Sequence, residues 1–306
     1  MTLRIEVPAT CANLGPGFDT LGIAVDLSDI VRVNFDMSSH SVSLRSDSVE
    51  LDSTNNLICR AYRSWADDTD AELPGACFTL ESHIPHARGL GSSAASIVAG
   101  LVAAAHAAGE KHPRERILRL ATAVEGHPDN IAPAVLGGLT TAFRDGDHVR
   151  ALHVASYLDL RAVLYVPEDR LDTESARRAI PSTVPLEDAV YDLGRLAYLT
   201  TALIWGRWNL IAPAMRDRLH QPYRARLVPA LDDLMEAALA AGAYGACLSG
   251  GGPSVLALAP TDRAADIAAA FLSAAATLSW PGSILDLAVR ESGYVIKEEK
   301  DSDGVP

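Results

Sequence analysis

The stretch IPHARGLGSSAAS at residues 84–96 places two glycines around one leucine, followed at once by two serines and two alanines. A glycine-rich turn that leads into a helix is a typical anion site. Glycines let backbone N–H groups approach a phosphate, and the helix N-terminus adds partial positive charge. Two familiar phosphate loops do not match, because G-x-x-x-x-G-K-[ST] needs a lysine and G-x-G-x-x-G needs a glycine where Ala94 stands. By itself the turn leaves phosphate binding and close helix packing both open.

The segments around this turn alternate between strand-like and helix-like patterns without a regular βαβ order. Such a mixture favours the α+β class over a doubly wound parallel sheet. Strands are predicted at 3–7, 23–27, 31–37, 41–46, 76–85 and 161–167, and on both sides of a glycine turn in 244–260. Helices are predicted at 55–68, 92–109, 113–126, 172–181, 186–208 and 227–242, with a short helical piece in 127–143. A loop is predicted at 9–22, and a loose polar tail at 297–306.

Composition excludes several classes of partner. The chain has 306 residues and a formal net charge of −13. With no basic stripe, we expect neither nucleic acid nor a membrane surface as a partner. No apolar run reaches the ~18 residues of a membrane span, and no export signal opens the sequence. The four cysteines show no metal-binding spacing, which predicts reduced thiols in a cytoplasmic protein.

Read as a whole, P-x-x-x-G-L-G-S-S-A-A at 85–95 resembles the nucleotide loop of the GHMP small-molecule kinases. ATCANLGPGFDTLG (9–22) resembles the substrate motif of that family, and CLSGGGPSVLAL (247–258) resembles its C-terminal glycine motif. Within the family, three further blocks are similar to those of the homoserine kinases in particular. They are EGHPDNIAPAVLGG (125–138), TESAR (173–177) and PYRARLVP (222–229).

The resemblance implies a two-lobed α+β fold. Its N-terminal lobe, expected at 1–156, is like domain 2 of ribosomal protein S5, and its C-terminal lobe, expected at 157–306, is ferredoxin-like. The implied reaction is phosphorylation of L-homoserine by ATP to O-phospho-L-homoserine in threonine biosynthesis. Family members are often homodimers, so the resemblance implies a homodimer as well. Two alternatives stay open: a sister kinase acting on another small hydroxylated carboxylate, and a non-catalytic regulator that binds nucleotide or amino acid.

The resemblance also implies which residues bind the nucleotide and its metal. The ATP-binding positions are Pro85, His86, Ala87, Arg88, Gly89, Leu90, Gly91, Ser92, Ser93, Ala94 and Ala95. Mg²⁺ takes hard oxygen ligands, and the resemblance points to Ser93 and Glu125. Asn55 and Asn56 are candidates for neighbours of the adenine.

The residues implied for the substrate suit a small amino acid. They are Asn13, Asp19, His127, Asn130, Arg177 and Arg224. An arginine can bind a carboxylate through two parallel hydrogen bonds, and an ammonium group needs a carboxylate or amide oxygen. Without the resemblance, the same residues have ordinary interpretations. Asn13 and Asp19 could hold a turn, the two arginines could be surface charges, Asn130 could cap a helix, and His127 could be structural.

The implied catalytic residues, Asn130, Glu125 and Ser93, include no general base. The amide of Asn130 cannot accept a proton at neutral pH, and Asp129 is adjacent in sequence and expected to point elsewhere. Phosphoryl transfer has a loose transition state in which positioning and charge neutralisation do most of the catalysis. The sequence therefore predicts a kinase that aligns the hydroxyl without a dedicated base.

Overall fold

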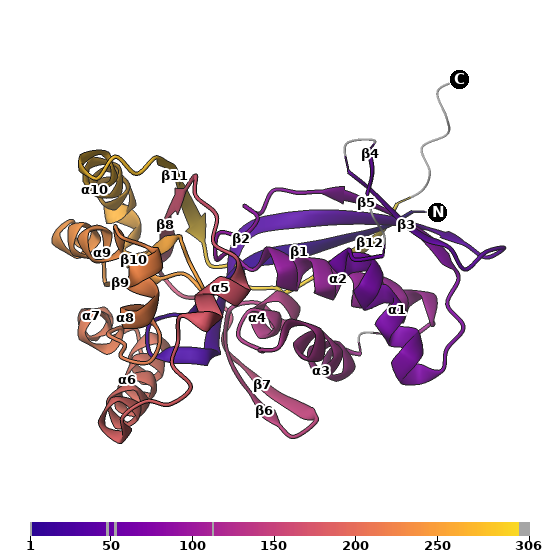
Figure 1. Cartoon of the computed structure of the whole chain (residues 1–306), viewed down its shortest axis with the longest axis horizontal. Helices are drawn as coiled ribbons and strands as arrows, with labels where there is room; N and C mark the ends of the chain where they lie inside the picture. The colour runs from indigo at the N-terminus through magenta and orange to yellow at the C-terminus, as the bar shows by residue number, and fades with distance from the viewer. Residues whose placement is uncertain (1, 47–48, 52–53, 112, 300–306) are drawn as a thin grey trace.

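The computed structural model of the chain describes residues 2–46, 49–51, 54–111 and 113–299, and Figure 1 shows two lobes side by side. Within these ranges the first lobe has a mixed sheet in the order β12-β1-β2-β5-β3-β4, with β6 pairing β2 and β7 pairing β6. Its strands are β1 (Thr2–Asn13), β2 (Gly17–Asp36), β3 (Val42–Ser46), β4 (Val49–Leu51), β5 (Gly75–Glu81), β6 (Leu139–Asp145), β7 (His148–Ala155) and β12 (Val295–Glu299). Alternate β1 residues Leu3, Ile5 and Val7 are buried, as expected for a strand with one face on the core.

The structure corrects the predicted loop at 9–22. β1 continues to Asn13, and a single strand, β2, replaces the two strands predicted at 23–27 and 31–37. β1 and β2 pair along nearly their whole length, so cross-strand hydrogen bonds override the turn preference of Asn, Gly and Pro. The turn residues still disturb the strand pairing, because the register between β1 and β2 shifts at Pro8/Ala9 and at Ala12/Asn13.

Helices α1 to α4 lie against one face of the first sheet (Figure 1). They are α1 (Leu57–Thr69), α2 (Ser92–Ala107), α3 (Arg114–Glu125) and α4 (Ile131–Leu136), and they confirm the four helices predicted in this half. α2 is buried along most of its length because its small residues let neighbouring elements come close. A Cβ on Gly100 would lie 2.2 Å from the carbonyl oxygen of Ile58 in α1.

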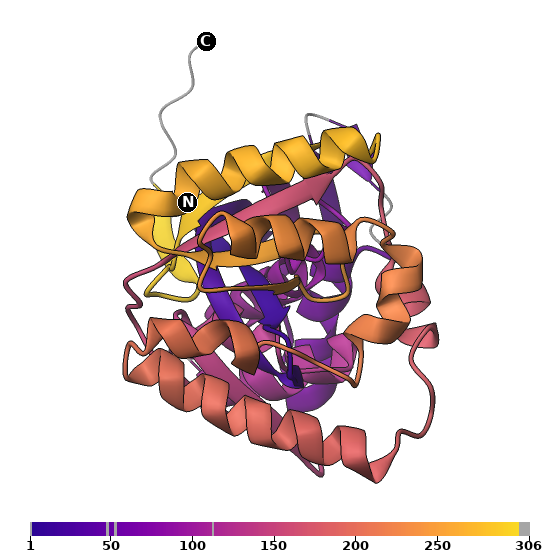
Figure 2. The ribbon, with the colours of Figure 1, turned by 90° about the vertical axis from the view of Figure 1, so that its left-hand side faces the viewer.

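The second lobe has an antiparallel sheet in the order β11-β8-β10-β9, covered on one face by α9 and α10 (Figure 2). Its strands are β8 (Arg161–Pro167), β9 (Gly245–Leu248), β10 (Val255–Ala259) and β11 (Gly282–Ala288). Its α-helices are α5 (Thr173–Arg178), α6 (Leu186–Ile204), α7 (Ile211–Ala214), α8 (Gln221–Arg224), α9 (Leu231–Ala240) and α10 (Ala264–Thr277). Short 3₁₀ turns are η1 (Trp208–Leu210), η2 (Ala225–Leu227) and η3 (Thr261–Arg263). The α+β class is confirmed.

Of the two hydrophobic cores among the described residues, one extends across both lobes and the other lies within the second lobe. Leu164 of β8 and Leu256 of β10 belong to the same buried cluster as Ile5 of β1, so the second sheet turns one face to the first lobe. β12 also returns to pair with β1, which corrects the predicted loose tail for residues 297–299. Residues 300–306 of that tail lie outside the described residues. The lobe boundary at residue 156 stays a prediction.

Two further observations bear on the sequence expectations. Among the described helices, none is long and apolar enough to cross a membrane. Cys11, Cys59 and Cys247 are buried, Cys77 is partly buried, and none of the four forms a disulfide.

Candidate functional site

The glycine loop, residues 84–91, is compressed between the two lobes. Gly89 and Gly91 have φ values of 73° and 72°, in the left-handed region that favours glycine. A Cβ on Gly91 would lie 2.0 Å from Oγ1 of Thr10, and one on Gly89 would lie 2.2 Å from the carbonyl oxygen of Ser249. The loop therefore needs both glycines to fit between β1 and the turn after β9.

A cavity of about 180 Å³ opens where this loop meets the N-terminus of α2. Gly91 is the N-cap of α2 and supplies no side-chain cap, so N–H groups of the first helical turn remain available to a ligand. Those N–H groups and the helix dipole make this end of the cavity suited to an anion. The residues lining the cavity from the second lobe are Leu171, Asp172, Thr173, Gly250, Gly251 and Gly252.

The positions predicted to bind nucleotide divide into two groups. Those that line the cavity are His86, Ala87, Arg88, Gly89, Gly91, Ser92 and Ser93. Leu90, Ala94 and Ala95 instead point into the core, and Pro85 is also absent from the lining. The guanidinium of Arg88 donates to the carbonyl oxygens of Pro167 at 2.7 Å and Glu168 at 2.6 Å, so it fastens the loop to the second lobe.

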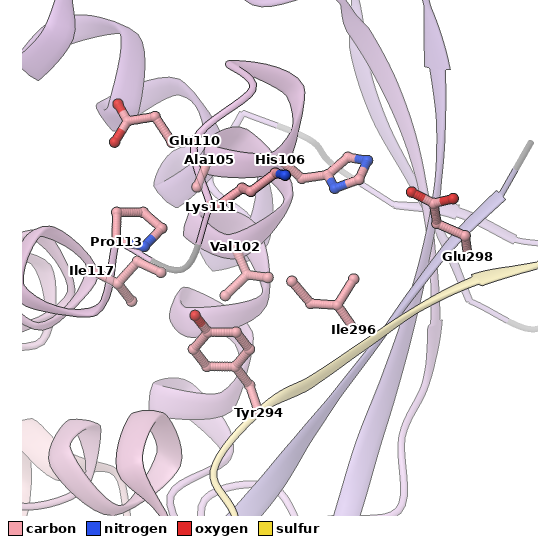
Figure 3. Close-up of a pocket in the computed structure, with 10 residues that line it drawn as sticks. All are labelled: Val102, Ala105, His106, Glu110, Lys111, Pro113, Ile117, Tyr294, Ile296 and Glu298. Carbon is pink, nitrogen blue, oxygen red and sulfur yellow. The ribbon is translucent and has the colours of Figure 1, made fainter.

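A different cavity, about 250 Å³, lies near the other end of α2 (Figure 3). Val102 and His106 of α2 line it together with Tyr294 and Ile296 near the C-terminal end of the chain. The C-terminus of a helix carries partial negative charge, which disfavours an anion. A phosphate is therefore expected at the N-terminal end of α2 and not here.

Ser93 and Glu125 place two oxygen ligands beside the α2 N-terminus. Oγ of Ser93 donates to Oε1 of Glu125 at 2.5 Å, and both residues line the cavity. α3 ends at Glu125 because Gly126 adopts a left-handed conformation and turns the chain away. Burial raises the pKa of Glu125 above its usual value, although the Ser93 hydrogen bond acts in the opposite direction. A hydroxyl and a carboxylate at this spacing suit a hard divalent cation such as Mg²⁺.

His127, Asp129 and Asn130 form a connected buried group at the start of α4. Oδ1 of Asp129 accepts from Nδ1 of His127 and from the backbone N–H of Asn130 at 3.0 Å. Burial alone would lower the pKa of His127, but the hydrogen bond and charge of Asp129 raise it above its ordinary value. Nε2 of His127 is buried without a hydrogen-bond partner among the described residues. It can therefore hydrogen-bond to a ligand, as a donor when the ring is protonated and as an acceptor when the ring is neutral.

Asn130 does not cap α4 with its side chain, although it occupies the N-cap position. Its Oδ1 accepts from Oγ1 of Thr10 at 2.8 Å, which orients the amide. The capping interpretation of Asn130 is therefore wrong. Thr10 lies within the block 9–22, but only the fold indicates that it contacts Asn130.

Asn13 and Asp19 lie at the tip of the β1–β2 hairpin, both with positive φ. Nδ2 of Asn13 donates to the carbonyl oxygen of Gly250 at 2.9 Å, and its Oδ1 accepts from the backbone N–H of Asp19 at 3.1 Å. Asn13 therefore holds the turn and joins the two lobes. The carboxylate of Asp19 faces Arg177 in two hydrogen bonds, of 2.6 Å and 3.1 Å.

Arg224 is a buried cation, with a relative exposure of 2%. Its guanidinium donates to the carbonyl oxygens of Ala176 at 3.2 Å and Gly250 at 3.1 Å, which are neutral groups. Among the described residues, no carboxylate lies within ion-pair distance of it. Burial, followed by the charge of Arg177, lowers the pKa of Arg224 to about 10. The surface-charge interpretation is therefore wrong for Arg224, whereas Arg177 is partly exposed.

Sequence reasoning missed His220 and Phe18. Nε2 of His220 lies 2.8 Å from the carbonyl oxygen of Gly15, which can only accept, so this nitrogen carries a proton. Nδ1 lies 3.1 Å from Nη1 of Arg224, which can only donate, so this nitrogen is the acceptor. The ring of Phe18 stacks on His220 and lies beneath both Arg177 and Arg224. His220 immediately precedes the QPYR segment, so position alone was the available signal.

The proposed adenine neighbours remain predictions. Oδ1 of Asn56 caps α1 by accepting from the backbone N–H of Ile58 at 2.9 Å. Neither Asn55 nor Asn56 is among the residues that line the cavity.

The sequence and structure of this chain are similar to those of known kinases. A family profile described as "GHMP kinases N terminal domain" matches residues 56–138, and one described as "GHMP kinases C terminal" matches residues 197–277. A homoserine kinase of Desulfitobacterium hafniense is 40% identical, with 96% of this chain and 99% of that protein covered. A homoserine kinase of Synechocystis is 42% identical, with 88% and 89% covered. The crystal structure of homoserine kinase from Cytophaga hutchinsonii superposes with a TM-score of 0.87 at 29% identity, with 97% of both chains covered.

Proposed function

Because the chain belongs to the GHMP kinase family, we propose that it phosphorylates the hydroxyl of L-homoserine with ATP and forms O-phospho-L-homoserine for threonine biosynthesis. The observation that carries the proposal is the buried guanidinium of Arg224, which among the described residues has no carboxylate within ion-pair distance and donates to Gly250, a residue that lines the cavity beside the glycine loop. A buried cation without a direct ion-pair partner is costly unless a ligand supplies one. The α-carboxylate of a small amino acid would do so.

The rest of the zwitterion fits the neighbouring groups. Arg177 and Asp19 already form an ion pair, and a ligand that carries both charges can join it, with its ammonium group on Asp19 and its carboxylate toward the arginines. Asn13 supports Asp19 by accepting a hydrogen bond from its backbone N–H. The side-chain hydroxyl would then extend toward Asn130 and His127, which line the cavity beside the glycine loop.

ATP would place its phosphates against the glycine loop and the first turn of α2. Backbone N–H groups and the hydroxyls of Ser92 and Ser93 can donate to phosphate oxygens there. Ser93 and Glu125 would hold Mg²⁺, which when bound neutralises phosphate charge. Asp129 raises the pKa of His127, and the protonated ring would donate from its unpartnered Nε2 to the oxygens of the transferring group.

Proton removal would need no dedicated base in this arrangement. The carboxylate of Asp129 already accepts from His127 and from the backbone of Asn130, which supports a positioning role for it. Asn130, oriented by Thr10, would align the hydroxyl. The transition state of phosphoryl transfer is loose, so the proton can leave late, to a phosphate oxygen or to water.

A substrate panel tests the function. We expect ADP release, measured in a coupled assay with Mg²⁺ and ATP, to be fast with L-homoserine. It should be near background with L-serine, mevalonate and galactose. Serine is the matched control because it lacks one methylene group of homoserine. With its carboxylate at Arg224, its hydroxyl would fall short of Asn130. Turnover with another panel member alone would identify a sister kinase. Tight nucleotide binding with no turnover at all would indicate a regulator.

The absence of a general base gives a second prediction. We expect Asp129→Asn to lower kcat by less than about tenfold, because it removes support for His127 and no proton acceptor. Its KM for homoserine should change little. Asn130→Asp, which introduces a carboxylate at the reacting end, is the informative companion variant. A loss of kcat near 10⁴-fold in Asp129→Asn with substrate binding intact would restore Asp129 as the base.

The cysteines bear on the cellular compartment of the protein. We propose a reducing cytoplasm, supported by four cysteines that form no disulfide, of which Cys11 lies on β1 within the substrate block.

A further inference from the structure

Two buried carboxyl groups meet where α6 packs against the segment that leads from α7 into α8 (Figure 1). Asp192 of α6 is 1% exposed, and the side chain of Asp217 is fully buried. Oδ1 of Asp192 accepts from the backbone N–H of Arg218 at 3.0 Å. Its Oδ2 has no hydrogen-bond donor among the residues that the structure describes, yet its carboxyl group is in hydrogen-bond contact with that of Asp217. Two ionised carboxylates can only accept, so this contact requires a proton.

Asp217 already uses both of its oxygens as acceptors. Its Oδ1 accepts from the backbone N–H of Leu219 at 2.9 Å, and its Oδ2 accepts from those of His220 at 3.1 Å and Gln221 at 2.6 Å. Hydrogen bonds from three N–H donors favour the ionised form of a carboxylate. The proton of the pair is therefore placed on Oδ2 of Asp192, which can donate it to Asp217.

The turn that Asp217 holds carries the groups that orient Arg224. Nδ1 of His220 accepts from Nη1 of Arg224 at 3.1 Å. Oε1 of Gln221 accepts from the backbone N–H of Leu248 at 2.7 Å, which joins the start of α8 to β9. A shift of this turn would therefore move the imidazole ring and α8, and with them the guanidinium that faces the substrate site.

The cations on either side of the pair do not remove the need for a proton. Burial, followed by the hydrogen bond and the charge of Asp217, raises the pKa of Asp192 well above its ordinary value. The backbone N–H of Arg218 and the charge of Arg195 act in the opposite direction and are outweighed. The guanidinium of Arg218 instead faces the two carboxylates in the first turn of α6, at 3.2 Å and 3.5 Å.

The other titratable groups that interact with Asp217 are His220, Arg224 and Cys247. Burial lowers the pKa of His220 and raises that of Cys247, so both are uncharged at neutral pH. Arg224 is then the cation that α8 adds to this environment. The contact between the two carboxyl groups therefore depends on the proton that they share.

We propose that Asp192 donates a proton to Asp217, and that this carboxyl pair positions α8 so that Arg224 can bind the carboxylate of the substrate. Both are positioning residues, because neither lines the cavity at the glycine loop. The inference rests on the proposed function, since it assigns the pair a part in binding L-homoserine. Loss of the proton would leave two negative charges in contact inside the protein, which would separate α6 from the turn and displace Arg224. The affinity for homoserine should therefore fall at alkaline pH.

Calorimetric titration with L-homoserine from about pH 6 to about pH 10 tests the positioning role. Asp192→Asn keeps an acceptor for the N–H of Arg218 and a donor for Asp217, but it has no proton to lose. It should bind homoserine within about twofold of the native chain at neutral pH. Above the pKa of Asp192, the ratio of the native Kd to the variant Kd should rise by up to about tenfold per pH unit. Comparing the two proteins at the same pH cancels the titration of the substrate amine.

Two further variants separate positioning from general structure. Asp192→Leu keeps the side-chain volume and removes both hydrogen bonds, so at neutral pH it should raise the Kd for homoserine at least about tenfold and leave the affinity for ATP near native. Asp188→Asn, one turn earlier on α6, is the matched control and should keep the alkaline loss of affinity. A Kd ratio that stays flat across the pH range, or an Asp192→Asn variant as weak as Asp192→Leu, would overturn the positioning role. If Asp192→Leu does not fold, the pH series of Asp192→Asn decides.

The shared proton has a test that needs no ligand. Because the pKa of Asp192 is raised in the fold, its protonated carboxyl stabilises the protein at acid pH, and this contribution is lost as pH rises from the unfolded value of about 4 through the folded pKa. The melting temperature of Asp192→Asn should therefore rise relative to that of the native chain over this range. A difference that does not change with pH would overturn the shared proton. The expected change in a chain that fails to bind homoserine would confirm the proton and contradict the proposed function.

Discussion

Replacing Arg224 with methionine should raise the KM for L-homoserine by roughly 10²- to 10³-fold and leave the KM for ATP nearly unchanged. Truncating one member of a buried charge pair costs about 2–5 kcal/mol, and each 1.4 kcal/mol is about tenfold in affinity. The guanidinium of Arg224 is buried against neutral acceptors, so the ligand carboxylate would be its main ionic partner. Methionine keeps most of the side-chain volume and removes the charge.

Two comparisons separate this effect from a general loss of structure. Arg226→Met changes an exposed arginine two residues away and should leave both KM values unaltered. The amino alcohol that lacks the carboxylate of homoserine should bind the native enzyme and Arg224→Met equally weakly, which isolates the carboxylate contact. If Arg224→Met loses kcat with an unchanged KM, or still prefers homoserine over the carboxylate-free amino alcohol as strongly as the native chain does, Arg224 does not bind the carboxylate.

Contacts in the site show which features a sequence can predict. The glycine loop and α2 could be predicted because their signals are local: two glycines, two serines and a run of small helix formers between 89 and 105. The β1–β2 hairpin could not, because its Asn, Gly and Pro residues favour a loop and only pairing across the sheet decides otherwise. A local signal fails wherever a distant strand supplies the deciding hydrogen bonds.

The electrostatic environment of the site residues could not be predicted from the sequence, for the same reason. Whether Arg224 is a surface charge or a buried one depends on Ala176 and Gly250, which are distant in sequence. His220 supports Arg224 while its other nitrogen bonds to Gly15, 205 residues away. Arg88 lies in the middle of the glycine loop, yet its contacts with Pro167 and Glu168 turn its guanidinium toward the second lobe. In each case the residue type could be read from the sequence, but the residues that it contacts could be identified only from the fold.

Replacing Glu125 with glutamine should lower kcat by about 10²- to 10³-fold at saturating ATP, since metal-assisted charge stabilisation contributes several kcal/mol to phosphoryl transfer. Glutamine preserves the acceptor for Oγ of Ser93 and removes the negative charge that a cation needs. The apparent affinity for Mg²⁺ should fall in parallel. Thr122→Val, at a buried hydroxyl one turn earlier in α3, is the structural control and should keep both kcat and Mg²⁺ affinity near native values.

The raised pKa of Glu125 fixes the sign of two pH effects. Because burial favours the protonated carboxyl, Mg²⁺ affinity should decline on acidification at a higher pH than an ordinary glutamate would give, and Glu125→Gln should lose that dependence. In the folded state the raised pKa means that ionised Glu125 destabilises the protein above that pKa, and the cost disappears as pH falls through it toward the unfolded value. Glu125→Gln should therefore melt at the same or a higher temperature than the native chain at neutral pH. A variant that melts lower while keeping full activity would show that Glu125 is a structural acid and that Mg²⁺ is held elsewhere.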